Sequence, residues 1–246
     1  MSDQRKKKRS KVSLKDYELI FVTENNPEIH YAKNDYIHVG QHNSAWEEDV
    51  LKRSKFVERW MAEQDSSILQ LIPYIVCFKG DRQILSYQRS GGGEGRLEKK
   101  YSIGIGGHVN SDDKVSDRAS IKAELEKIST PNSWDIVIRG AAREIIEETS
   151  VPASVIRDNL IEVGTIYTPS DGSSEVTQNP KVGEVHIGII YFLNVPNDIK
   201  VNKLEGLINP AFTKGTPDNL DQYETWSRMV YENIDPMFDI YDKKVK

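Results

Sequence analysis

The chain has 246 residues, a formal net charge of −5 and 37% hydrophobic residues, with four Trp, eleven Tyr and six Phe. The apolar content is low for a folded chain of this length, but the aromatic residues exclude the disordered class. We therefore expect one domain of ordinary size with polar extensions or insertions, rather than two full cores.

Several protein classes are excluded at once. The longest apolar stretches, such as residues 71–78, are too short to span a bilayer. The basic N-terminus lacks the apolar region of a secretory signal. The single cysteine, Cys77, excludes an intramolecular disulfide and a cysteine-only metal cage, and its apolar surroundings predict a buried hydrophobe. We expect a cytoplasmic protein that does not associate with membranes.

The charge is unevenly distributed. Residues 1–11 carry a net charge of +5, which leaves −10 for the rest of the chain. We interpret this basic tail as a solvated, disordered end, and contact of the tail with nucleic acid or another polyanion is the alternative. The acidic body argues against a nucleic-acid groove on the domain itself.

The elements are predicted in chain order from hydrophobic patterns and turn residues. An N-terminal extension, residues 12–67, contains one helix at about 45–64, and residues 68–246 form the domain. In that domain we expect a hairpin (71–78 and 83–88), a glycine loop (90–96), a strand (101–109) and a helix near 119–128. A helix at 135–149, strands at 160–168 and 184–195, a loop at 196–220 and a last helix at about 220–233 follow. This order predicts a mixed sheet with helices packed on it.

The helix at 135–149 carries an acidic triplet. Glu144, Glu147 and Glu148 are spaced i, i+3 and i+4, so they lie on one helix face. Like charges at this spacing repel each other, whereas Mg²⁺ prefers carboxylate, water and phosphate oxygens. The triplet is therefore a candidate metal platform, and a solvated acidic helix face is the alternative.

The segment from Arg143 to Val151 resembles the second half of the Nudix hydrolase motif, G-x5-E-x7-R-E-U-x-E-E-x-G-U, in which U is a bulky aliphatic residue. Gly106 and Gly107, after a short strand, resemble the paired glycines that open this motif. The resemblance covers about residues 68–195, with a weaker echo at 224–227. Within it, residues 72–96, 102–109 and 182–188 resemble a bacterial Nudix branch described as predicted phosphoesterases. The resemblance implies an α/β fold, namely a Nudix-like α/β/α sandwich with a mixed β-sheet, an N-terminal extension and an insertion at 108–134 within the motif.

The chain departs from the motif at three places. Gly107 and Asp135 are separated by 27 residues, where the motif has five. The first glutamate of the motif is Asp135 here, and the terminal glycine is Ser150. That glycine often needs a positive φ, which costs a serine on the order of 1–2 kcal/mol. None of these departures touches the carboxylate triplet, so we expect catalysis to be retained.

The resemblance implies divalent-metal-dependent hydrolysis of a diphosphate linkage in a nucleoside diphosphate derivative. Glu144, Glu147 and Glu148, with the carbonyl near Gly107, would hold Mg²⁺ or Mn²⁺. Arg143 matches the motif arginine, which orients a motif glutamate by an ion pair. These four charged residues are the predicted catalytic residues.

Further candidates lie outside the motif. Phosphate contacts are predicted for the basic residues around the glycine loop, for which a solvated loop is the equal alternative: Arg89, Arg96, Lys99 and Lys100. The candidates for an additional acid outside the motif, which would act as a base or as a further metal ligand, are Glu184, Glu224, Asp171 and Glu175. Glu184 is also a candidate for substrate binding. We interpret His108 and His186 as hydrogen-bonded structural histidines.

Two other functions remain open. A catalytically inactive Nudix-fold module that binds or senses a nucleotide is the first alternative, and a nucleic-acid-associated protein acting through its basic tail is the second. The expected partner is a small nucleotide-type substrate, and a homodimer is a further expectation. Neither a dinucleotide fingerprint nor a phosphate-binding P-loop is found in the sequence.

Overall fold

The computed structural model describes residues 17–26, 34–89, 100–111, 134–170, 180–199 and 207–246. The predicted basic tail (1–11), the predicted helix near 119–128 and most of the insertion at 108–134 lie outside these ranges. Within them, no helix combines the length and the apolar character that a membrane span requires.

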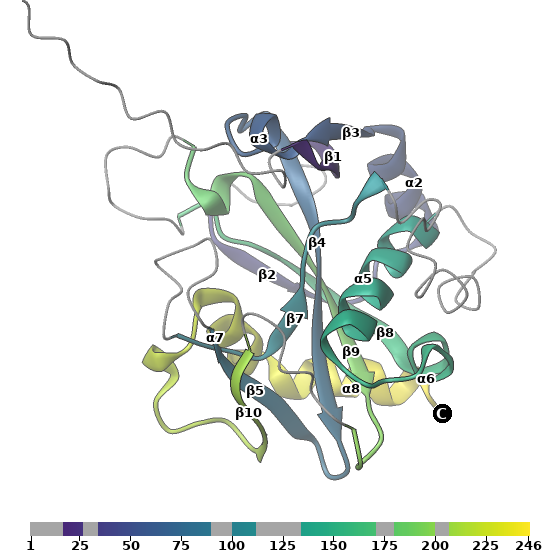
Figure 1. Ribbon diagram of the computed structural model, residues 1–246, viewed down its shortest axis with the longest axis vertical. Helices are drawn as coiled ribbons and strands as arrows, with labels where there is room; N and C mark the ends of the chain where they lie inside the picture. Colours follow the sequence, from purple (N-terminus) through teal and green to yellow (C-terminus); the bar gives the residue numbers. More distant parts are fainter. Residues whose placement is uncertain (1–16, 27–33, 90–99, 112–133, 171–179, 200–206) are drawn as a thin grey trace, which may run out of the picture.

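A parallel strand pair forms the centre of the sheet. β4 (Ile68–Lys79) runs beside β9 (His186–Asn194), from the pair Gln70–His186 to the pair Phe78–Asn194 (Figure 1). The predicted hairpin is confirmed, because β4 is followed by the antiparallel β5 (Gln83–Arg89). The strand order is β10-β5-β4-β9-β8-β2, with β8 at Leu160–Tyr167 and β2 at Tyr36–Val39. The predicted mixed sheet is therefore present.

Alternate residues of β4 supply the two cores. Leu71, Ile75 and Cys77 pack toward α5 (Asp135–Glu148) and α6 (Ala153–Asn159). Tyr74 and Val76 pack toward α7 (Thr225–Glu232) and α8 (Ile234–Lys244) on the other face. Because a strand that is buried on both faces reads as a continuous apolar run, the sequence of β4 shows no alternation. Helices on both faces confirm the predicted α/β/α sandwich.

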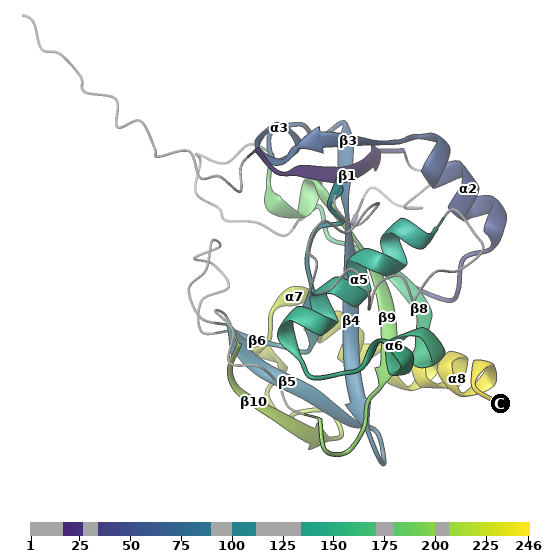
Figure 2. The ribbon, with the colours of Figure 1, turned by 45° about the vertical axis from the view of Figure 1, so that its right-hand side comes forward.

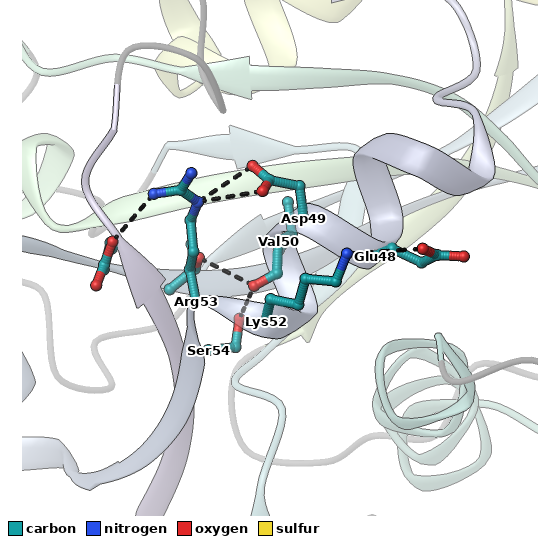
Figure 3. Close-up of polar contacts among 8 residues, drawn as sticks. Glu48, Asp49, Val50, Lys52, Arg53 and Ser54 are labelled. Atoms are coloured by element: carbon teal, nitrogen blue, oxygen red, sulfur yellow. Dashed lines mark hydrogen bonds and ion pairs between the residues drawn. The ribbon is translucent and has the colours of Figure 1, made fainter.

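The predicted helix at 45–64 is wrong in its length. The structure has α2 (Ser44–Lys52), then β3 (Ser54–Glu58) and the short α3 (Arg59–Ala62). The carbonyl of Val50 accepts hydrogen bonds from the Arg53 amide at 3.1 Å and the Ser54 hydroxyl at 2.6 Å, which ends the helix (Figure 3). The apolar residues that suggested one helix are thus divided among three elements.

The N-terminal elements pair with the main sheet (Figure 2). β1 (Leu19–Glu24) pairs with β3 and with the first residues of β4, and β2 pairs with β8. A small core of Ile20, Val22, Ala62 and Ile68 lies beneath β1. The division of the chain into an extension (12–67) and a domain (68–246) remains a prediction.

The C-terminal region differs from the prediction in two ways. The last helix, predicted at about 220–233, begins only at Thr225, after a 3-10 turn at Leu220–Gln222, and continues past a break at Asn233 as α8. The predicted loop at 196–220 contains a strand, β10 (Leu207–Lys214), which pairs with β5. Its register shifts between Ile208 and Ala211, and Asn209 there has a positive φ of 51°. Asn and Pro are turn-like in sequence, but a β-bulge accommodates them in a strand.

Candidate functional site

Helix α5 begins at the predicted residue, Asp135, and ends at Glu148, one residue before the predicted end. Its inner face buries Val137, Ala141 and Ile145 against the sheet. The preceding residue, Trp134, is also buried, and its indole N–H donates to the Tyr191 hydroxyl at 3.2 Å. These contacts fix the helix on the sheet and place its acidic residues beside the glycines of β7 (Gly104–Gly106).

Arg143 is the centre of the polar contacts of α5. Its Nη1 atom donates to Oε1 of Glu144 at 2.7 Å and to Oε2 of Glu147 at 3.3 Å, and its Nη2 atom donates to the His108 carbonyl at 2.7 Å. The arginine is only 6% exposed, so solvent screens these ion pairs weakly. The ion pair that the Nudix resemblance implies between Arg143 and a motif glutamate is present.

The two halves of the divided motif meet in space. A Cβ atom on Gly107 would lie 2.3 Å from Oε1 of Glu144, and one on Gly106 would lie 2.2 Å from the Pro73 carbonyl oxygen. At Gly106 only glycine allows this approach, because the atom in the way belongs to the backbone of β4, whereas at Gly107 the close atom is the end of the Glu144 side chain. Gly107 and Glu144 thus lie against each other although many residues separate them in the sequence. This is possible because the entropic cost of closing a loop grows only slowly with its length.

Glu148 is a partly buried carboxylate on the same helix. Burial raises its pKa to about 7; Glu144 adds to this shift, whereas Arg89 opposes it. Its Oε2 atom is buried and has no hydrogen-bond partner within the described part of the chain. A buried carboxylate oxygen that accepts no hydrogen bond lowers the stability of the folded chain, and a bound cation can offset this loss.

The end of α5 contradicts the strain that we expected at Ser150. Thr149 caps the helix in an extended conformation, with its hydroxyl donating to the Ile145 carbonyl at 2.7 Å. Among the described residues, the only non-glycine residues with positive φ are Arg82 and Asn209. Ser150 therefore bears no left-handed strain, because the threonine cap replaces the glycine ending.

The structure brings one of the predicted phosphate-binding residues near the triplet. Arg89 ends β5 and interacts electrostatically with Glu148. Lys100 instead donates to the Asp221 carbonyl at 2.6 Å, and Glu184 accepts from the Lys181 amide at 2.8 Å. The other basic candidates, Arg96 and Lys99, lie outside the described residues.

The remaining acidic candidates lie apart from the triplet. Asp135 is the first residue of α5, and Glu224 caps α7 on the opposite face of the sheet. Asp171 and Glu175 are outside the described residues. The role of an additional acid, for which Glu184, Glu224, Asp171 and Glu175 were the candidates, stays a prediction.

Both predicted structural histidines are hydrogen-bonded. Nε2 of His108 lies 2.8 Å from Oε1 of Gln70, and Nδ1 of His186 lies 2.7 Å from the Val182 carbonyl. Burial lowers the pKa of His108 well below its usual range, and His186 contributes to the same shift.

Two tyrosines contact the glycine strand β7 but are not among the site residues predicted from the sequence. The Tyr87 hydroxyl donates to the Gly104 carbonyl at 2.6 Å, and the Tyr74 ring lies against Gly104 on the other face. In the sequence both read as ordinary strand residues, and the one signal available is the alternation that places Tyr87 on the same face as Arg89.

The donor set fits a hard divalent cation. Within the described ranges, no three His, Cys, Asp or Glu side chains are grouped closely enough to hold a metal ion by themselves. Mg²⁺, however, is often held by one or two carboxylates together with waters and substrate phosphates. Glu147 and the unpartnered Glu148 oxygen provide such carboxylates, and Gly107 lies against the neighbouring Glu144.

Structural comparison defines the class of fold. The crystal structure of Tm1382, "a putative Nudix hydrolase", superposes with a TM-score of 0.58 and 21% identity, covering 88% of this chain and 98% of the other. The chain thus has a Nudix-like α/β/α fold. A MutT protein from Methanosarcina mazei Go1 superposes with a TM-score of only 0.36 and 16% identity, over 72% of this chain and 96% of its own.

Sequence comparison gives one relative of comparable length. Protein YmaB of Bacillus subtilis (strain 168) is 28% identical over 184 residues, which cover 73% of this chain and 77% of YmaB. No protein-family model matches the chain.

Proposed function

We propose that this protein is a Mg²⁺-dependent, Nudix-type pyrophosphohydrolase that acts on a nucleoside diphosphate derivative. The observation that carries the proposal is the contact of Gly107 with Glu144 on α5, next to the unpartnered carboxylate oxygen of Glu148. This arrangement joins the two halves of the motif in a fold that resembles Tm1382.

Glu147 and Glu148 are the proposed principal metal ligands, with a backbone carbonyl near Gly107 as a further ligand. Mg²⁺, or Mn²⁺ in its place, neutralises phosphate oxygens and activates a water when it is bound. Glu144 is the third carboxylate of the proposed ligand set, and its Oε1 atom is held by Arg143 at 2.7 Å. Arg143 keeps this carboxylate oriented and ties α5 to the His108 carbonyl.

Substrate phosphates are proposed to bind between α5 and the end of β5. The charge of Arg89 acts on Glu148, since it opposes the rise in the pKa of this carboxyl. A guanidinium can bind a phosphate through two parallel hydrogen bonds. Lys100 is one strand away and has its ammonium group on the Asp221 carbonyl. Specificity for the rest of the substrate would come from loops, as in other folds of this kind.

The proposal is tested by a screen of nucleoside diphosphate derivatives with Mg²⁺, in which phosphate or nucleoside monophosphate is measured. We expect turnover of at least one class of compound. A Glu147→Gln, Glu148→Gln variant should lose activity by roughly 100-fold or more, since loss of an outer-shell partner alone costs about 10–100-fold. Its melting temperature should not fall.

The matched control removes two exposed carboxylates from the opposite side of the sheet. Glu232→Gln with Asp239→Asn makes the same change of charge on α7 and α8, and full activity is expected. Full activity of the Glu147, Glu148 variant would show that the metal assignment is wrong. Tight nucleotide binding by the parent protein without turnover, in Mg²⁺ and in Mn²⁺, would instead identify a nucleotide-sensing module.

A further inference from the structure

The backbone of β7 is confined from both sides. On the α7 face, a Cβ atom on Gly104 would lie 2.1 Å from the ring of Tyr74. On the α5 face, a Cβ atom on Gly107 would lie 2.3 Å from the carboxylate of Glu144. The ring of Tyr74 thus lies directly beneath Gly104, while Gly107, the residue that follows β7, faces the carboxylate of Glu144.

The ring of Tyr74 is itself held in place by its hydroxyl group. Tyr74 pairs with Gly106 in the β4–β7 ladder, and its ring leans along the ladder onto Gly104. The hydroxyl donates to Oε1 of Glu224 at 2.7 Å and lies 2.8 Å from Oγ of Ser227. The side chain is 5% exposed, so no water competes for these bonds.

Glu224 is a buried carboxylate with an unusual number of donors. Besides Tyr74, its oxygens accept from the Trp226 amide at 2.9 Å and from the amide and hydroxyl of Ser227 at 3.0 and 2.5 Å. A carboxylate that is only 8% exposed needs such compensation. Short side chains are the usual N-caps of helices, whereas this longer one caps α7 and also reaches Tyr74.

The same network holds the chain that leads into β7. The Ile103 amide donates to Oγ of Ser227 at 3.0 Å, and the Glu224 amide donates to the Tyr101 carbonyl at 2.9 Å. The start of α7 is thereby joined to the segment just before Gly104–Gly106. The side chain of Glu224 thus contacts Tyr74 beneath β7, and its backbone amide contacts the segment that leads into β7.

We propose that Glu224 is a positioning residue of the candidate metal site, which acts through Tyr74 to hold the Gly106–Gly107 backbone at the correct distance from α5. The inference rests on the proposed function, because it requires that this backbone helps to bind the metal. It assigns Glu224 a different role from that of an additional base or ligand. The carboxylate lies on the α7 face of the sheet, and both of its oxygens already accept hydrogen bonds.

The first test removes only the hydroxyl of Tyr74. In Tyr74→Phe the ring still fills the space beneath Gly104, but its anchor is lost. We expect Mn²⁺ affinity, measured by electron paramagnetic resonance without substrate, to fall by about 10-fold, the lower limit for a lost outer-shell contact. The amide signals of Gly106 and Gly107 should shift in the nuclear magnetic resonance spectrum of the metal-free protein. Tyr241→Phe is the control, since Tyr241 is buried in the same core and bonds to the backbone of Asn194.

The second test separates helix capping from positioning. Glu224→Asp retains a favoured N-cap for α7, but its carboxylate is one methylene too short to hold Tyr74 as well. We expect a melting temperature close to that of the parent and a loss of Mn²⁺ affinity similar to that of Tyr74→Phe. The double variant should bind Mn²⁺ no more weakly than either single variant, because both changes break the same contact.

The inference is overturned if Tyr74→Phe and Glu224→Asp bind Mn²⁺ as tightly as the parent at a temperature where all proteins are folded. A loss of affinity in Tyr241→Phe equal to that in Tyr74→Phe would also overturn it. Failure of the proposed function would be visible in the parent protein itself, as absence of Mn²⁺ binding that depends on Glu147 and Glu148. The two failures are thus distinguished by which protein shows them.

Discussion

At the scale of single residues, the candidate site is a set of charges that lowers the stability of the folded chain. Glu148 is partly buried beside the carboxylate of Glu144, and both effects raise its pKa to about 7. Arg143 pairs with Glu144 and Glu147, whereas Oε2 of Glu148 has no hydrogen-bond partner among the described residues. Such local conflicts are common at functional sites, where a ligand supplies the missing partner.

The first prediction concerns the pH dependence of stability. A carboxyl group whose pKa is raised on folding stabilises the protein below its unfolded value of 4.5, and this contribution is lost as the pH rises through about 7. Relative to the parent, Glu148→Gln should therefore become more stable between pH 4.5 and 8, by on the order of 3 kcal/mol. Urea denaturation in the presence of a chelator measures this difference. The exposed Glu232→Gln serves as the control, and a difference that is the same at both pH values would contradict the prediction.

At the scale of elements, the end of α5 shows how one motif position was replaced. Thr149 closes the helix with its hydroxyl on the Ile145 carbonyl, and the same hydroxyl accepts from the Val151 amide at 3.2 Å. Pro152 then caps α6. The chain thereby turns after α5 without a residue of positive φ.

The second prediction restores the glycine of the motif. Ser150→Gly would relieve strain only if residue 150 had a positive φ, and it has none. Glycine instead raises the conformational entropy of the unfolded chain, so we expect a loss of stability of about 0.4–1 kcal/mol. Thermal unfolding of the variant beside the parent measures the effect. A gain in stability would mean that the helix ending described above is wrong.

At the scale of the whole molecule, a buried contact joins the N-terminal elements to β8 on the α5 face of the sheet. Oε1 of Glu162 on β8 accepts from the backbone amide of His42 at 3.0 Å and lies 2.6 Å from its Nδ1 atom. The imidazole stacks on Trp46 with ring centroids 3.6 Å apart, and Trp46 contacts Trp134 at the start of α5. Residues before β4 are thus linked to the helix that carries the acidic triplet.

The third prediction tests this link. Glu162→Ala leaves the buried His42 side chain without this partner, and an unsatisfied buried polar group costs about 1–3 kcal/mol. Hydrogen exchange should become faster in β2 and α2, while α8 remains protected. Glu162→Gln keeps an acceptor oxygen and is expected to show a much smaller change. Uniform acceleration over the whole chain in Glu162→Ala would argue against a local link.

Most of the central sheet and the acidic helix could be predicted from sequence because their signals are local. The hairpin of β4 and β5 follows from a turn between two apolar runs, and the face shared by the three glutamates follows from helical spacing. The errors fell where tertiary contacts decide. The apolar positions of α2, β3 and α3 have a spacing that also fits a single helix. The Asn and Pro of β10 are typical of a loop, but in the structure they lie at a β-bulge within a strand.

The sequence by itself determined the identity, spacing and common face of the candidate catalytic residues, because these follow from the geometry of one helix. Only the tertiary structure decided which groups meet them. Gly107 approaches Glu144 from a distant part of the chain, Arg143 reaches the His108 carbonyl, and Glu224 is committed to Tyr74 on the other face of the sheet. Contacts between residues far apart in sequence depend on how sheet and helices pack, and no local pattern encodes that packing.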